Sequence, residues 1–327
     1  MRKALFTGCL VIFSIAALAQ YNRENPLVHT YSIVAMDTAT GDIGVAVQSH
    51  WFSVGTVVAW AESGVGAVAT QSFSNPAFGP QGLQLMKTGL DAEATLQALL
   101  ASDEGREYRQ VGVIDVSGKT ASHTGAKNIK EAGHVVGDYY AVQANLMENN
   151  TVWQAMADSF EGSAGEPLAE RMLKALEAAQ TEGGDIRGKQ SAALVVVSGT
   201  PTGKSWIDRK VDLRVDDHEN PLQELRRLWK VHQAYEYMNA GDVAVEAGDF
   251  ERAGELYQSA ETMFPNNLEM QYWHAINLAN VGNLKEALPM FKSVFSKNPK
   301  WKKLTPRLID NGMLSVSEGD LKQIMKQ

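Results

Sequence analysis

The chain has 327 residues, a formal net charge of -8 and 44% hydrophobic residues. An acidic chain of this kind lacks the concentrated basic face that a nucleic-acid partner requires. Its length favours two domains over one.

The first nineteen residues have the three parts of a signal peptide. Arg2 and Lys3 supply the positive start, residues 10–18 form a short apolar run, and residues 17–19 read Ala-Leu-Ala, a small-x-small cleavage site. We therefore expect a secreted or periplasmic protein that begins at Gln20, with residues 20–29 as a short N-terminal extension. No later apolar run reaches the length of a membrane span. Because the only cysteine leaves with the signal, no disulfide is expected.

Residues 30–230 are predicted to form a first, mixed α/β domain. Apolar, β-branched runs bounded by turn residues predict strands at 30–37, 42–49, 54–60, 65–71, 109–115, 119–124, 139–146, 190–198 and 211–216. Helical patterns follow at 79–89, 91–102, 150–160 and 166–180, with Asp91 placed to cap the second. Strands and helices therefore come in blocks. This order suits helices on the outer faces of two stacked sheets better than a doubly wound βαβ sheet.

Residues 231–327 are predicted to be helical and contain an internal repeat. Four pairs of residues lie 34 positions apart: Gly248 and Gly282, Ala253 and Ala287, Tyr257 and Phe291, Pro265 and Pro299. The glycine ends a first helix, the alanine lets two helices approach, the aromatic fills the gap, and the proline stops the second helix. This pattern resembles tetratricopeptide repeats over residues 232–300, with helices near 219–231 and 304–326 as caps. Such arrays bind peptides or proteins, or serve packing and dimerisation.

Seven motifs in order resemble the DUF1028 family. They are H-T-Y-S-I-V-A-M-D, G-A-V-A-T-Q-S-F-S-N-P, R-Q-V-G-V-I-D, S-H-T-G, Y-A-V-Q-A-N-L, G-G-D-I-R-G-K-Q-S-A-A-L and L-R-V-D-D-H, and they cover about residues 29–230. The family is placed in the N-terminal nucleophile (Ntn) hydrolase-like superfamily. The resemblance implies an α+β fold, a four-layer αββα sandwich, but no assigned activity.

The superfamily's nucleophile position falls on Thr30. A threonine there can act only if the chain ahead of it is cut, because its own freed amine then serves as the base. Signal peptidase would not cut after His29, so a second cleavage is needed. The position that supports the nucleophile falls near Gln48 or Ser49, neither of them a carboxylate, and no lysine lies between Thr30 and Lys87. The alternative is that Thr30 is an ordinary β-branched strand residue.

Several amides lie where a pure apolar core would not place them. Gln48 and Gln71 end apolar strands, and Gln143 and Asn145 interrupt another. Buried amides are costly unless they are hydrogen-bonded, so they either line a cleft that holds an amide substrate or form a structural network. Ser74 and Asn75 belong to a turn that we expect at the rim of such a cleft.

Two further groups are candidates for the site. His123 follows a strand and is either a general acid or base or the cap of a turn. The loop before the strand at 190–198 carries Asp185, Arg187, Lys189 and Gln190 among glycines. These polar groups either orient a substrate or the amine of Thr30, or pair with one another to set the strand's register.

Two functions are consistent with this sequence. The first is an exported amidase or peptidase in which Thr30 attacks a small amide or peptide. The second is a catalytically silent binding protein whose repeats recognise a protein or peptide partner. No cofactor or metal is implied, and H-E-x-x-H is absent. The repeats would also suit a homo-oligomer. The lysines at positions 285, 292, 297, 300, 302 and 303 either point to an acidic partner or form an ordinary solvated face.

Overall fold

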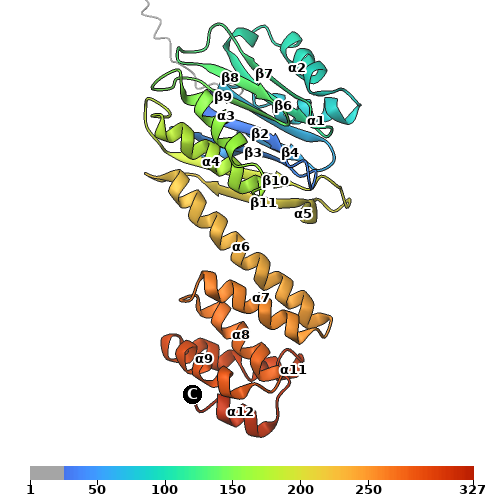
Figure 1. Cartoon of the computed structure of the whole chain (residues 1–327), viewed down its shortest axis with the longest axis vertical. Helices are drawn as coiled ribbons and strands as arrows, with labels where there is room; N and C mark the ends of the chain where they lie inside the picture. Colours follow the sequence, from blue (N-terminus) through green and yellow to red (C-terminus); the bar gives the residue numbers. More distant parts are fainter. Residues whose placement is uncertain (1–25) are drawn as a thin grey trace, which may run out of the picture.

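The computed structural model describes residues 26–327, so the predicted signal peptide and most of the extension lie outside the described part. Two antiparallel sheets with flanking helices are followed by an all-helical C-terminal region (Figure 1). The mixed α+β class predicted from the sequence is thereby confirmed.

The smaller sheet has the strand order β1-β5-β6-β7, with β4 also paired to β5. Its strands are β1 (Leu27–Val28), β4 (Ala59–Glu62), β5 (Gly66–Phe73), β6 (Arg109–Asp115) and β7 (Thr120–Thr124). β1 and β4 pair with different stretches of β5, residues 72–73 and 66–69. β1 is therefore a two-residue addition to this sheet.

The larger sheet has the order β11-β10-β3-β2-β9-β8. Its strands are β2 (Thr30–Met36), β3 (Ile43–Ser49), β8 (Gly133–Gly137), β9 (Tyr140–Ala144), β10 (Ser191–Val197) and β11 (Arg209–Val215). β2 and β3 are central and fully buried, as their continuous apolar runs predicted. The chain leaves the smaller sheet after Val28 and enters the larger one at Thr30.

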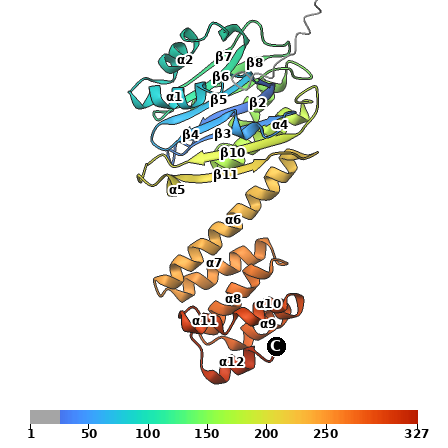
Figure 2. The same ribbon diagram turned by 180° about the vertical axis from the view of Figure 1, so that it is seen from behind.

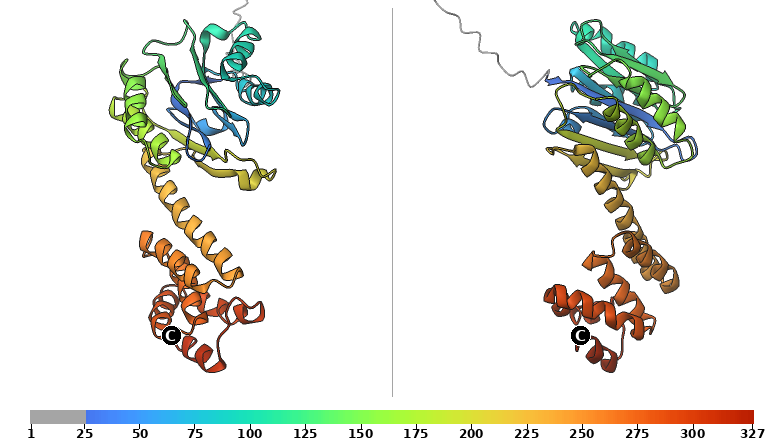
Figure 3. Two further views of the ribbon diagram at one scale, coloured as in Figure 1. Left: turned by 45° about the vertical axis from the view of Figure 1, so that its right-hand side comes forward. Right: turned by 60° about the vertical axis from the view of Figure 1, so that its left-hand side comes forward.

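Each sheet buries its outer face under helices (Figures 2 and 3). α1 (Phe78–Lys87) and α2 (Ala92–Ala101) pack on the smaller sheet, and α3 (Val152–Gly162) and α4 (Leu168–Thr181) pack on the larger one. Asp91 caps α2 as predicted, since its carboxylate accepts from the backbone N–H of Ala94 at 2.9 Å. Between the sheets lies a third apolar cluster of mostly valine and alanine.

One sequence prediction in this region was wrong, and one strand was not predicted. Residues 54–60 are not a strand: residues 54–56 form a short 3₁₀ helix, η1, and β4 begins only at Ala59. Ser53 has a positive φ of 56°, and the N–H groups of Val57 and Val58 both donate to the carbonyl of Val54, so the chain turns instead of extending. β8 was not predicted, because its polar and glycine residues mask the strand pattern.

The C-terminal region begins with one long helix, α6 (Pro221–Glu246), which runs from the sheets into the helical region (Figure 1). The predicted boundary at 230/231 therefore falls inside a helix. The other helices are the four-residue α5 (Ser205–Asp208), which precedes β11, and α7 (Phe250–Met263), α8 (Leu268–Asn280), α9 (Leu284–Lys297), α10 (Pro299–Leu304), α11 (Arg307–Asp310) and α12 (Glu318–Ile324).

The 34-residue pairs occupy equivalent places in these helices. Gly248 and Gly282 follow α6 and α8 with positive φ values of 75° and 79°. Ala253 and Ala287 are fully buried one turn into α7 and α9. The repeat in the sequence is thus a repeat of helix pairs.

Candidate functional site

One end of the space between the sheets is polar. Along each strand, alternate residues face the other sheet. In β2 this set includes Val34, which packs in the apolar cluster between the sheets, and by the same alternation Ser32 and Thr30. The same alternation places five more polar side chains there: Ser49, Gln71, Gln110, Gln143 and, directly after β9, Asn145. The backbone carbonyl of His29, in the link between β1 and β2, joins them through Ser49. The inter-sheet layer is therefore apolar at one end and lined with hydrogen-bonding groups at the other.

Thr30 lies at this polar end, at the first residue of β2. Its side chain is 0% exposed, and its Oγ1 donates to the carbonyl of Val28 at 3.0 Å. The hydroxyl therefore points back along the chain that precedes it. In the intact chain the nitrogen of Thr30 is a peptide nitrogen, whose lone pair is delocalised into the carbonyl, so it cannot act as a base.

The peptide carbonyl just ahead of Thr30 is held by two side-chain donors. The hydroxyl of Ser49 donates to the oxygen of His29 at 2.5 Å, and Nη2 of Arg187 donates to the same oxygen at 2.9 Å. Ser49 is the direct register partner of Thr30 in β3, which explains its place. Two donors fixed on one carbonyl oxygen are the arrangement that stabilises negative charge when such a carbonyl is attacked.

The loop before β10 holds Arg187 in this position. Both oxygens of Asp185 accept from the guanidinium, at 3.0 and 2.7 Å, and the N–H of His50 also donates to this carboxylate at 3.2 Å. The side chain of Asp185 is 0% exposed, and that of Arg187 is 31% exposed. A bidentate pair with a buried carboxylate restricts the guanidinium to one orientation. Asp185 thus positions Arg187.

The buried amides form one hydrogen-bonded network across the two sheets. Gln71 Nε2 donates to Gln110 Oε1 at 2.7 Å and to the carbonyl of Thr30 at 3.1 Å, and its Oε1 accepts from Ser32 at 2.6 Å. Asn145 Nδ2 also reaches Gln110 Oε1, at 2.9 Å. Gln143 belongs to the same network, because its Nε2 donates to the hydroxyl oxygen of Ser32 at 2.6 Å. All are fully buried, and their bonds to the carbonyl of Thr30 and to Ser32 fix the backbone around Thr30.

We expect Gln110→Met to lower the free energy of unfolding by about 3 kcal/mol. Gln110 bonds both Gln71 and Asn145 through its oxygen, and its Nε2 donates to the carbonyl of Ala144 at 2.8 Å. Methionine has a similar size but leaves these buried groups short of a partner. Urea unfolding curves measure the loss. The exposed Gln154 on α3 provides the control, since Gln154→Met is expected to change stability by less than about 0.5 kcal/mol; equal effects at the two positions would contradict the network's role.

His29 is buried beside this network. Its Nδ1 lies 2.8 Å from Oδ1 of Asn145, an oxygen that can only accept, so the imidazole donates from Nδ1. Its ring packs edge-on against Phe73 with 5.6 Å between centroids. Burial lowers the pKa of His29 below its usual 6.5, and the charge of Arg187 acts in the same direction, while the Asn145 bond and Asp185 oppose it. His29 is therefore held in its neutral form.

This pKa shift predicts acid sensitivity. The unfolded chain protonates His29 near pH 6.5, whereas the folded chain takes up that proton only at lower pH. The contribution of His29 to the free energy of unfolding is therefore fully present above about pH 7. It decreases as the pH falls through 6.5 and levels off below the pKa of His29 in the folded chain. His134 also has a pKa lowered by burial and adds to the slope with the same sign. In uncut chains that carry Thr30→Ala, thermal unfolding between pH 5 and 8 should depend less on pH when His29 is replaced by Gln; identical slopes would contradict the assignment.

The remaining predicted residues lie away from Thr30. Gln48 faces the helices: Oε1 of Gln48 accepts from the hydroxyl of Tyr31, which also reaches Gln180 on α4. Neighbouring strand positions point to opposite faces, so only one of Gln48 and Ser49 could share the side of Thr30. His123 lies in β7 of the smaller sheet, where its Nε2 is hydrogen-bonded to the carbonyl of Arg106 at 3.0 Å.

The other four predicted residues form hydrogen bonds with nearby backbone groups or loop residues: Ser74, Asn75, Lys189 and Gln190. The N–H of Ser74 donates to the carbonyl of Pro26 at 2.9 Å, which ties the segment ahead of Thr30 to the smaller sheet. Asn75 accepts from the N–H of Ala77 in the turn before α1. Lys189 and Gln190 bond Asn220 and Asp217, at 2.8 and 3.1 Å, just before α6.

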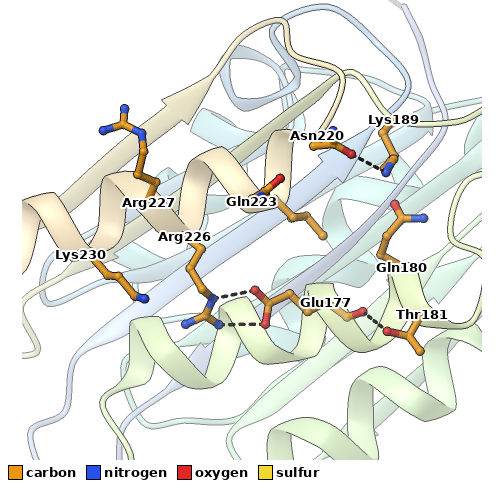
Figure 4. A pocket seen from close by; sticks show the side chains of 10 residues that line it. Glu177, Gln180, Thr181, Lys189, Asn220, Gln223, Arg226, Arg227 and Lys230 are labelled. Atoms are coloured by element: carbon orange, nitrogen blue, oxygen red, sulfur yellow. Dashed lines mark hydrogen bonds and ion pairs between the residues drawn. The ribbon is translucent and has the colours of Figure 1, made fainter.

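A surface pocket of about 590 Å³ lies between α4 and the start of α6 (Figure 4). Arg226 pairs there with Glu177 and Glu170, at 2.6 and 2.5 Å, and Lys189 bonds Asn220 across its rim. The pocket touches Gln180 but its lining does not include Thr30. It lies on the helix side of the larger sheet, whereas Thr30 faces the space between the sheets.

Within residues 26–327 no group of three or more His, Cys, Asp or Glu side chains is arranged to hold a metal ion. In the same part of the chain, no helix has both the length and the apolar character needed to cross a membrane.

The fold is that of a protein with two facing antiparallel sheets, outer helices and a helical C-terminal region. The sequence model described as "Family of unknown function (DUF1028)" matches residues 30–225, and the chain belongs to this family. A DUF1028 protein from Silicibacter pomeroyi, known from its crystal structure, is similar, with 30% identity and a TM-score of 0.55. The similarity covers 62% of this chain and 88% of that one. No curated protein matches the chain.

Proposed function

We propose that this protein is an exported hydrolase of the Ntn type, an amidase or peptidase that uses Thr30 as its N-terminal nucleophile. The observation that carries the proposal is the carbonyl of His29, the residue before Thr30, which accepts from two side-chain donors, Ser49 and Arg187. The stacked sheets with outer helices are consistent with the αββα sandwich of that superfamily.

Two chemical steps make the nucleophile available. Oγ1 of Thr30 bonds to the carbonyl carbon of His29, the His29–Thr30 C–N bond breaks, and the hydroxyl proton passes to the departing nitrogen. Water then adds to the resulting ester, its C–O bond to Thr30 breaks, and His29 leaves as a carboxylic acid while the hydroxyl is restored. The freed amine of Thr30 then serves as the base when the hydroxyl attacks a substrate amide. Ser49 and Arg187 stabilise the oxyanion in both reactions.

The test is the intact mass and N-terminal sequence of the protein secreted by an exporting host. A mature chain that begins at Thr30 supports the hydrolase. A uniform start at Gln20 leaves the nitrogen of Thr30 in a peptide bond and rejects it. The same measurement tests export and the predicted cut after Ala19.

The second candidate is a catalytically silent binding protein. It is favoured by residues 26–28, which hydrogen-bond with β5 and keep Thr30 internal in the intact chain. In this case the helical region, which we propose to be tetratricopeptide-like, would recognise a protein or peptide partner. Equilibrium binding of a partner that survives Thr30→Ala, in a chain that starts at Gln20, would select this function.

A further inference from the structure

We infer that residues 26–29 occupy the site in which the acyl part of a substrate binds. The substrate would be an extended peptide that carries a branched apolar residue followed by a planar-ring residue at the attacked carbonyl. This inference rests on the proposed function, because it assumes that Thr30 attacks a substrate in the place where His29 now lies.

The backbone of this segment is bound as an added strand. β1 pairs antiparallel with β5, with Leu27 opposite Phe73 and Val28 opposite Ser72, and the N–H of Ser74 donates to Pro26. If the segment leaves after a cut, residues 72–74 become an unpaired strand edge next to Thr30. An open edge of this kind takes up extended peptides by the same main-chain hydrogen bonds.

The side chains of the segment alternate between solvent and the protein interior. Leu27 is 51% exposed, whereas Val28 is 0% exposed and packs in the apolar cluster between the sheets. His29 is 4% exposed and fits between Phe73 and Asn145. The protein thus has one pocket for a branched apolar side chain and one for a planar ring.

A second observation at this place concerns Ser72. Its backbone has a positive φ of 72°, which is unusual for serine, and its buried hydroxyl has no hydrogen-bond partner among residues 26–327. Backbone strain and an unpaired buried hydroxyl are features that cluster at ligand sites. Ser72 lies directly opposite Val28, beside the strand edge that would receive the peptide.

The segment also explains how the intact chain keeps this site closed. The oxygen of His29 already occupies the position between Ser49 and Arg187. After a cut, the new carboxylate of His29 would stay beside the guanidinium of Arg187. Residues 26–29 therefore act first as an intramolecular substrate and then as a bound product that must leave before another peptide enters.

The first experiment measures peptide binding to uncut, full-length chains that all carry Thr30→Ala. The probe is a fluorescein-labelled peptide with the sequence of residues 25–29 and a C-terminal amide, followed by fluorescence anisotropy. Val28→Glu with His29→Gly should release the segment and raise the affinity for the probe at least about tenfold over the chain with the native segment. Leu27→Glu, whose side chain faces solvent, is the matched control and should leave the site closed. Equal affinity of all three chains for the probe would overturn the inference.

A second measurement covers the case in which the double variant does not fold. It uses chains with Thr30 intact and compares the rate of cutting between residues 29 and 30. His29→Phe should cut within roughly threefold of the native rate, and His29→Asp at least about tenfold more slowly, because a carboxylate cannot replace a flat ring beside Phe73 and Asn145 Oδ1. Equal rates would overturn the inference.

The two proposals fail in different ways. Probe binding by the double variant in a protein that never starts at Thr30 keeps the peptide site and rejects the hydrolase. A native chain that starts at Thr30, with no probe binding and no dependence on residue 29, keeps the hydrolase and rejects the peptide site.

Discussion

Thr30→Val is expected to abolish both the cut at residues 29 and 30 and any amide hydrolysis, a loss of roughly 10⁴-fold or more. Valine keeps the shape and β-branching of threonine but has no oxygen to form the ester. Only the bond from Oγ1 to the carbonyl of Val28 is lost from the fold, which costs about 1 kcal/mol. The variant should therefore fold and keep residues 20–29 attached, which intact mass measures directly.

Thr30→Ser is the matched control for this variant. It restores a hydroxyl at the same position, so cutting should return while the stability stays close to that of Thr30→Val. If Thr30→Val matures to a start at residue 30 as fast as the native chain, another protease makes the cut. In that case the oxygen of Thr30 has no part in it.

Ser49→Ala is expected to slow the cut by about 10²- to 10³-fold. The hydroxyl of Ser49 is one of two donors to the oxygen of His29, and its hydrogen bond strengthens as that oxygen gains negative charge. Arg187→Ala should have an effect of similar size on the rate. It also leaves the buried carboxylate of Asp185 without its charged partner, which lowers stability by roughly 3 kcal/mol. Ser49→Ala therefore tests the rate effect without the large loss of stability that Arg187→Ala brings. Time courses of intact mass measure the rate of the cut.

Ser191→Ala is the control for Ser49→Ala. Ser191 is equally buried and is the register partner of Ser49 in β10, but its hydroxyl donates to the carbonyl of Trp51 and does not touch His29. The Ser191 hydroxyl also accepts from the N–H of Val54 at 3.0 Å, so its loss should lower stability by about 1–3 kcal/mol. The substitution should nevertheless leave the cutting rate within about twofold, because this hydroxyl touches neither His29 nor Thr30. Equal slowing of both variants would show that Ser49 acts through packing and not through the oxyanion.

Much of the fold was predictable because its strands and helices have strong local patterns. The hairpin of β2 and β3, the capped helix after Asp91 and the 34-residue helix repeat all follow from residue spacing. The failures came where tertiary contacts override local preference. Residues 54–56 turn because Ser53 and Val54 are bonded to Asp216 and Ser191, which are distant in sequence.

The site was predictable only in part. Thr30, Ser49, Asp185 and Arg187 were named from the sequence. The structure brings Ser49 and Arg187 to the carbonyl that precedes Thr30, and Asp185 holds Arg187 there. Gln110 and Ser32 were missed, although both share the inward alternation of apolar neighbours such as Val34. That alternation is a signal that sequence reasoning could have used.

The sequence by itself determined the classes of the elements, the helical repeat and the residues that bear polar groups in buried strands. These features depend on neighbours within one turn of helix or one pair of strand positions. Only the tertiary structure decided that Arg187 reaches back 158 positions to the carbonyl of His29, and that residues 26–28 join the smaller sheet while Thr30 begins the larger one. Such contacts join residues that are remote in sequence, and strand register and loop docking set them, which local spacing does not encode.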